Sequence, residues 1–167
     1  MEGLTQNSKE EIWKILAEIP DPEIPVITIE ELGVLRDLQI NNNKIIVTIT
    51  PTYTGCPAMK LFEDEIKNTL LQKGYSDVFV NLSYTPAWTT DWITDEAKEK
   101  LKNFGIAPPV KGTEDKGLLF SLNKKKIQCP RCNSLNTTLK NQFGSTACKA
   151  LYFCDDCLEP FDYFKCF

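Results

Sequence analysis

Two cysteine pairs near the C-terminus constrain the fold of this chain more than any other feature of its sequence. The pairs are CPRC at 129–132 and CDDC at 154–157, and 21 residues separate them. A two-residue gap lets both thiolates of one pair point at the same ion, and four thiolates in a tetrahedron suit zinc or iron. The spacing predicts a zinc-ribbon β module over residues 128–167, whose metal ligands are Cys129, Cys132, Cys154 and Cys157.

Charge and cysteine content divide the 167 residues into two parts. Residues 1–123 carry 12 Lys/Arg, 19 Asp/Glu and one cysteine, whereas residues 124–167 carry 7 Lys/Arg, 4 Asp/Glu and six cysteines. A module of about 40 residues can hardly bury enough apolar surface to fold without a bound metal or a disulfide, so we expect the zinc to be structural. We predict a first domain at 1–105, a linker rich in proline, glycine and charge at 106–127, and the ribbon at 128–167.

The first domain reads as a small α+β sandwich in the order α-β-β-α-β, followed by one more helix. Capping boxes at Ser8/Glu11 and Thr28/Glu31 predict a helix start and a short turn. Hydrophobic periodicity and turn residues predict the remaining elements. These are a hairpin of LRDLQI and KIIVTIT, a helix from Pro57 to about Gly74, a strand in DVFVNLSY, and a helix from Thr94 to Gly105.

Several functional classes are disfavoured by composition. No apolar run approaches the roughly 18 residues that a membrane span needs, and the acidic, polar N-terminus does not resemble a signal peptide. Seven cysteines without such a signal favour a reducing compartment, so we expect a cytoplasmic protein that uses its thiols for metal. The net charge of −4 disfavours nucleic acid as the main partner.

Cys56 is the second feature that indicates chemistry. It lies in TPTYTGCPA, where a strand gives way to a helix, and as an N-cap its thiol would face free backbone N–H groups that lower its pKa. The chain has no histidine, so a Cys–His nucleophile is excluded. A thiolate that binds or passes metal remains, with Asp21 and Glu23 as oxygen ligands. The alternatives are an ordinary buried cysteine at an N-cap and two acids that cap nearby backbone.

Two further pairs of residues each allow two interpretations. A hairpin centred near residue 157 would put Cys148 and Cys166 almost opposite each other, as a second thiolate pair for metal or a cluster, or simply as two small half-buried residues. Trp88 and Trp92 are four residues apart and either pack in the core or form a surface for partner docking.

Longer motifs resemble known families. DPEIPV, LGVLRD and TPTYTGCPA resemble a family of iron–sulfur and metal assembly proteins that carry a DPE loop and one cysteine in a T-G-C-P setting. From about residue 10 onward the chain resembles the PaaD family, which belongs to phenylacetate degradation. The motifs that add this second resemblance are PAWTTDW, CPRC, FGSTACKALYFC and EPFDYFKC.

The resemblance implies an auxiliary protein of the phenylacetyl-CoA epoxidase system, whose oxygenase subunit holds a di-iron centre and whose reductase holds an iron–sulfur cluster. It implies Asp21 and Glu23 as the acids of the DPE loop, and Cys56 as the cysteine of the family. The expected function is non-enzymatic maturation: Cys56 binds iron or a cluster transiently, together with Asp21, Glu23, Cys148 and Cys166, and passes it to the oxygenase or reductase.

Three other functions remain as alternatives. The chain is a structural adaptor of the epoxidase complex, an electron carrier that holds iron in the four-cysteine site as rubredoxin does, or, more remotely, a ribbon that binds nucleic acid. A homodimer is left open.

Overall fold

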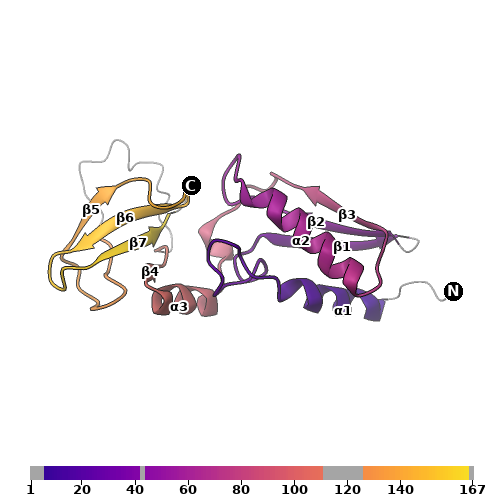
Figure 1. Ribbon diagram of the computed structural model, residues 1–167, viewed down its shortest axis with the longest axis horizontal. Helices are drawn as coiled ribbons and strands as arrows, with labels where there is room; N and C mark the ends of the chain where they lie inside the picture. Colours follow the sequence, from indigo (N-terminus) through magenta and orange to yellow (C-terminus); the bar gives the residue numbers. More distant parts are fainter. Residues whose placement is uncertain (1–5, 42–43, 111–125, 166–167) are drawn as a thin grey trace. The chain divides into compact units, whose positions relative to one another are not determined.

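The chain folds into two compact units. The computed structural model describes residues 6–41, 44–110 and 126–165, and contacts divide the chain into unit 1, Met1–Trp88, and unit 2, Thr89–Phe167 (Figure 1). The boundary therefore precedes the one expected near residue 105, because the helix that follows Thr94 belongs to the same unit as the ribbon.

Unit 1 is built on a three-stranded sheet in the order β1-β2-β3 (Figure 1). Strands β1 (Leu35–Asn41) and β2 (Lys44–Ile49) form the expected antiparallel hairpin. Strand β3 (Val78–Leu82) pairs with β2 in parallel, and helix α2 (Ala58–Gln72) connects these two strands. A parallel neighbour requires such a crossover, so the carboxyl end of β2 leads into the segment that contains Cys56.

Helices α1 (Gln6–Ala17) and α2 lie on one face of this sheet and contact each other. Their apolar stripes bury Ile12 and Leu16 of α1, and Phe62 and Ile66 of α2, at 2% exposure or less. The predicted cap at Ser8 is wrong, because α1 begins at Gln6 and Ser8 lies within it.

The predicted turn at Thr28 is confirmed in atomic detail. The backbone N–H of Thr28 donates to Glu31 Oε2 at 3.0 Å, and the N–H of Glu31 donates to Thr28 Oγ1 at 3.2 Å. This reciprocal capping box follows the DPE loop, where Asp21 N–H donates to Ile27 O and Ile29 N–H donates to Ile19 O, both at 2.9 Å. The loop is therefore held by backbone bonds at both ends.

Unit 2 begins with a 3-10 turn, Thr90–Trp92, and helix α3 (Asp95–Phe104). Thr94 caps α3 by accepting from Ala97 N–H at 3.1 Å, and Gly105 ends it in the left-handed conformation, φ 92°, as expected. A four-stranded sheet follows in the order β4-β7-β6-β5. Its strands are β4 (Ile106–Ala107), β5 (Thr137–Asn141), β6 (Lys149–Cys154) and β7 (Pro160–Phe164).

Strand β4 differs from the sequence expectation, which placed residues 106–127 in a linker. Ile106 pairs with Asp162 and Ala107 with Tyr163, in parallel, so this segment adds an edge strand to the ribbon sheet. Ile127 also joins the core of unit 2, at 1% exposure. A two-residue strand has no periodicity that a sequence could display, which is why the composition of its surroundings suggested a linker.

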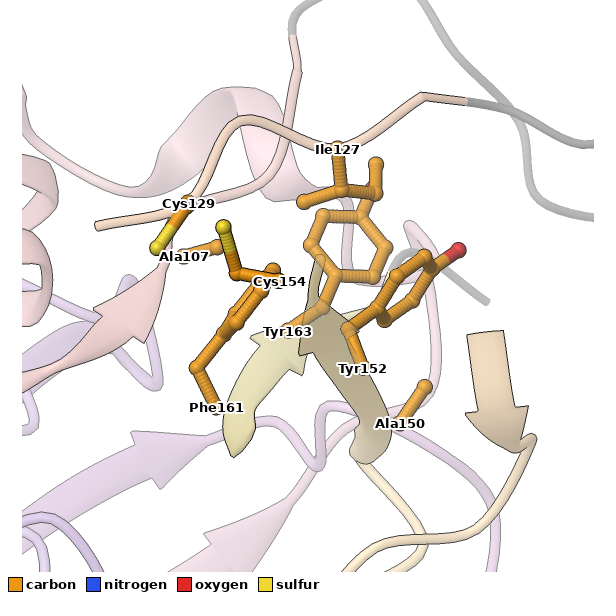
Figure 2. Packing of buried hydrophobic residues seen from close by; sticks show 8 residues of the cluster. All are labelled: Ala107, Ile127, Cys129, Ala150, Tyr152, Cys154, Phe161 and Tyr163. Carbon is orange, nitrogen blue, oxygen red and sulfur yellow. The ribbon is translucent and has the colours of Figure 1, made fainter. Parts of the chain in front are cut away.

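The core of unit 2 places aromatic rings beside two of the cysteines (Figure 2). Tyr152 stacks on Phe161 and meets Tyr163 edge-on, with ring centroids 5.8 Å apart in both pairs. Cys129 and Cys154 complete the same cluster and are fully buried. None of the helices in the described parts of the chain is long and apolar enough to cross a membrane.

Candidate metal sites

The structure brings the four predicted thiols of the ribbon together. The Sγ atoms of Cys129, Cys132, Cys154 and Cys157 all lie within 4.8 Å of one another. Cys129 Sγ is 3.8 Å from Cys157 Sγ, and Cys132 Sγ is 3.5 Å from Cys154 Sγ. A tetrahedral ion with metal–sulfur bonds of about 2.3 Å requires sulfurs about 3.8 Å apart, so this donor set fits a four-coordinate ion.

Both cysteine pairs have the same backbone geometry. In the first, Asn133 N–H donates to Cys129 O at 2.9 Å; in the second, Leu158 N–H donates to Cys154 O at 2.9 Å. Asn133 and Leu158 each follow the second cysteine of their pair and adopt positive φ, 62° and 61°. The matched turns aim all four sulfurs at one point and thereby build the site from two equivalent halves.

A polar network joins the two halves next to the thiols. Asp156 accepts from Ser134 Oγ at 2.5 Å and from Asn136 Nδ2 at 2.7 Å, so the second pair is tied to the segment that follows the first. These bonds lower the pKa of Asp156. Backbone N–H groups of Cys157 and Asp156 lower the pKa of Cys154 to about 7, which favours the thiolate that a metal requires.

Cys56 lies in a separate site in unit 1, at the carboxyl end of β2. Helix α2 has Pro57, with φ −67° and ψ −22°, as its N-cap, so the cap falls one residue later than expected and Cys56 directly precedes it. Its thiol interacts with the backbone N–H of Ala58 and the side chain of Tyr53. Gly55 beside it has φ +82° and nothing within 4 Å of the place where a Cβ would stand, so the turn is open.

The expected low pKa of Cys56 is wrong. Burial of the half-exposed thiol raises its pKa above the ordinary value of 9.0, and this outweighs the lowering by Ala58 and Tyr53. The carboxylates of Glu23 and Asp21 raise the pKa further, since they repel a thiolate. The sequence showed that Cys56 lies at the start of a helix, but not that its thiol is half-buried or that negative charge lies nearby.

The two acids of the DPE loop have different roles. Asp21 is 6% exposed, and its Oδ1 accepts from the N–H groups of Glu23 and Ile24, both at 2.8 Å. Asp21 therefore stabilises the loop by capping its backbone N–H groups, which is the second of the two roles that the sequence left open. Glu23 is exposed, and its negative charge contributes to the raised pKa of Cys56.

We predict that Cys56 reacts slowly with alkylating reagents. The thiolate is the nucleophile, and a raised pKa leaves a smaller thiolate fraction at pH 7–8 than a model thiol has. The rate should increase with pH through an inflection above 9.0, and Glu23→Gln should move that inflection down because it removes a negative charge. Alkylation resolved by mass spectrometry checks this, with Glu10→Gln on α1 as the control. An inflection below 8 would contradict the assignment of cause.

The other candidate residues do not gather at either site within the described residues. Cys148 is 7% exposed and lies 3.0 Å from Thr146 Oγ1. Lys165 N–H donates to Cys148 O at 2.9 Å, so the residue across from Cys148 is Lys165, one position before the expected cysteine. Cys166 lies outside the described residues, and its pairing stays a prediction.

Trp88 packs in the protein interior, which is one of the two roles that the sequence left open. This side chain is 5% exposed, and its Nε1–H donates to Leu32 O at 3.0 Å. It therefore stabilises unit 1 and offers little surface to a partner. Trp92 is half-buried at the end of the 3-10 turn of unit 2.

Comparison with known proteins shows which families the chain resembles. Residues 115–165 match the PaaD zinc beta ribbon domain, and residues 9–82 match the family of iron–sulfur cluster assembly proteins. Over 156 residues the chain is 48% identical to an Escherichia coli K12 protein that is named as one of the subunits of a "Putative 1,2-phenylacetyl-CoA epoxidase". The match covers 93% of this chain and 92% of the relative. The chain belongs to the PaaD family.

The PaaD-family chain is also similar to shorter proteins over just over half its length. It is 33% identical over 92 residues to the "Fe-S protein maturation auxiliary factor YitW" of Bacillus subtilis 168, covering 54% of this chain and 89% of that one. A crystal structure of a domain named DUF59, from Bacillus anthracis, superposes with a TM-score of 0.52 at 26% identity, covering 56% of this chain and 90% of that one. The α+β fold and the four-cysteine ribbon expected from the sequence are thus confirmed.

Proposed function

We propose that this member of the PaaD family is a non-enzymatic, cytoplasmic maturation factor of the phenylacetyl-CoA epoxidase system. It binds iron or an iron–sulfur cluster at Cys56 as cargo and delivers it to the oxygenase or reductase subunit. The names of its relatives, an epoxidase subunit and iron–sulfur maturation factors, support the two halves of this proposal.

The small number of metal ligands around Cys56 is the main support for the proposal. One thiol with a nearby exposed carboxylate, Glu23, offers too few protein ligands for permanent storage of an iron ion or cluster. The remaining coordination positions stay open to solvent, to sulfide or to side chains of the acceptor. A site of this kind favours transfer over retention.

The raised pKa of Cys56 makes the binding reversible. Metal binding replaces the thiol proton, which is released to solvent, and reprotonation of the thiol accompanies release of the metal. Because burial and the two acids favour the neutral thiol, the proton competes well with the cargo near neutral pH. Iron affinity at Cys56 should accordingly increase with pH.

The ribbon site supplies structure and no transfer chemistry. Cys129, Cys132, Cys154 and Cys157 would hold a zinc ion with a complete set of four ligands, and two of these thiols are buried in the core of unit 2. A closed four-cysteine site leaves no position for a substrate. Zinc is redox-silent, so a zinc-filled ribbon would also exclude electron transfer as rubredoxin performs it.

Anaerobic metal analysis tests the proposed binding site. The chain is purified without oxygen, mixed with ferrous iron and sulfide, desalted, and analysed for zinc, iron and sulfide. We expect one zinc per chain in wild type and in Cys56→Ser, with iron bound only by wild type and more of it at pH 8.5 than at pH 6.5. Equal iron in the two proteins would contradict a role for Cys56, and iron in place of zinc in Cys56→Ser would favour the electron carrier.

A further inference from the structure

A groove of about 380 Å³ lies in unit 1 between the DPE loop and the outer side of α2. This volume is at the small end of ligand pockets, which span roughly 300–1,000 Å³. It suits one or two side chains of a peptide better than a cofactor. The lining residues are Pro20 and Pro22 from the loop, and Leu61, Phe62, Asp64, Glu65 and Asn68 from α2.

The groove has an apolar floor with exposed apolar walls. Phe62 is 2% exposed and belongs to the core, whereas Leu61 is 56% exposed and both prolines are exposed. Phe62 packs in the core of unit 1, whereas most of the Leu61 side chain is left uncovered there. Apolar walls of this kind suit an apolar side chain of a ligand.

Two of the polar residues that line the groove are acidic, and one of them, Glu65, is exposed. Asp64 pairs with Lys60 at 2.8 Å, but Glu65 makes no ion pair with any residue that the structure describes. Residues 1–88 carry 13 Asp/Glu and 7 Lys/Arg, so this part of the chain has a net negative charge. A lysine or arginine next to an apolar side chain would complement this wall.

Both walls of the groove, α2 and the DPE loop, are formed by segments that also surround Cys56. On the helix side, Leu61 is about 4.5 Å and Asn68 about 15 Å along the axis from Ala58, which follows Cys56 by two residues. On the loop side, Pro22 lies between Asp21 and Glu23, the two acids that raise the pKa of Cys56. A peptide bound in the groove would thus need only a few more residues to reach the Cys56 thiol, because each extended residue spans about 3.3 Å.

We propose that this groove is the client-docking site: it binds a segment of the acceptor protein that carries a bulky apolar side chain followed closely by a lysine or arginine. The apolar side chain lies between Leu61 and the prolines, and the basic one reaches Glu65. Docking there presents the metal-accepting residues of the client to Cys56. The inference rests on the proposed function for its client and extends it by assigning the chemistry of recognition.

Charge argues against a second copy of the chain as the occupant. Two copies of unit 1 facing each other at this groove would bring two acidic surfaces together, and like charges across an interface cost several kcal/mol. A dimer that Leu61→Glu converts to a monomer would therefore overturn the proposal.

Binding of a defined peptide is the first test. The probe is an acetylated nonapeptide with a central leucine and a lysine two positions later, titrated into the full-length, isotope-labelled protein and followed by NMR. We expect shifts at the amides of residues 61–68 and affinity at least about tenfold weaker for Leu61→Glu, because the buried apolar area is lost. A peptide with glutamate in place of lysine should also bind more weakly, and Glu65→Lys should reverse that preference. Leu71→Glu is the matched control, since Leu71 is 60% exposed on the same helix but does not line the groove.

Co-expression with the epoxidase subunits separates this inference from the proposed function. If both hold, Leu61→Glu and Cys56→Ser each lower client iron at least about fivefold, and Leu71→Glu leaves it unchanged. Normal client iron with Leu61→Glu, together with loss in Cys56→Ser, would overturn the docking site and leave the transfer function standing. Peptide binding at the groove combined with normal client iron in Cys56→Ser would keep the docking site and remove the transfer function. Equal peptide binding by wild type and Leu61→Glu would overturn the docking site in every case.

Discussion

Cys132→Ser is expected to release most of the zinc and unfold unit 2 while unit 1 stays folded. Serine leaves three thiolates and an open position, and a hydroxyl is a poor ligand for a soft site. Apparent binding free energies of structural zinc sites, about 10–16 kcal/mol, match or exceed the whole stability of a small domain, about 5–15 kcal/mol. Loss of one ligand therefore removes the main source of stability of the ribbon sheet.

The measurement is zinc per chain, together with thermal unfolding that reports the two units separately. The ring cluster of Tyr152, Phe161 and Tyr163 lies in unit 2, so the assigned NMR signals of these rings follow that unit. Leu135→Ser is the control, because Leu135 is 54% exposed and close in sequence to the first cysteine pair but is no ligand. Full zinc occupancy and an unchanged transition in Cys132→Ser would show that the metal is held elsewhere.

The features that the sequence predicts correctly are those that depend on spacing along the chain. The two CxxC pairs fix a metal geometry, the Thr28/Glu31 box fixes a turn, and the two apolar stretches LRDLQI and KIIVTIT on either side of turn residues fix a hairpin, each within a short window. The four thiols meet within 4.8 Å because two equivalent turns close in the same way.

The features that the sequence does not predict depend on contacts far along the chain. Cys56 has a raised pKa because the fold buries it and brings the DPE loop near, and a capping position alone suggests the opposite direction. Strand β4 is too short to have a pattern of its own, and only its pairing with β7 reveals it. The groove on α2 combines residues 20–22 with residues 61–68, so a helix pattern alone shows Leu61 only as an exposed apolar residue.

Cys56→Ser should have a large effect on the client and a small one on this protein. Serine is a good capping residue, and its hydroxyl can accept from the Ala58 N–H that the thiol now faces. The free energy of unfolding of unit 1 should therefore change by roughly 1 kcal/mol or less. The zinc of the ribbon should stay, because its four ligands lie in unit 2.

The client, in contrast, should lose its metal. A hydroxyl keeps its proton at neutral pH and binds iron far more weakly than a thiolate does, so the variant cannot carry cargo. Thr54→Ser, an exposed change in the same loop, is the matched control and should leave the client intact. An adaptor would behave in the opposite way, since it needs the surface of the protein and not the thiol.

The most direct measurement is iron per oxygenase and reductase subunit, purified after co-expression with wild type, Cys56→Ser or Thr54→Ser. The transfer account predicts full iron and epoxidation with wild type and Thr54→Ser, and at least about fivefold less iron in one of the two subunits with Cys56→Ser. Normal iron and normal epoxidation with a folded, zinc-bound Cys56→Ser protein would contradict transfer through Cys56.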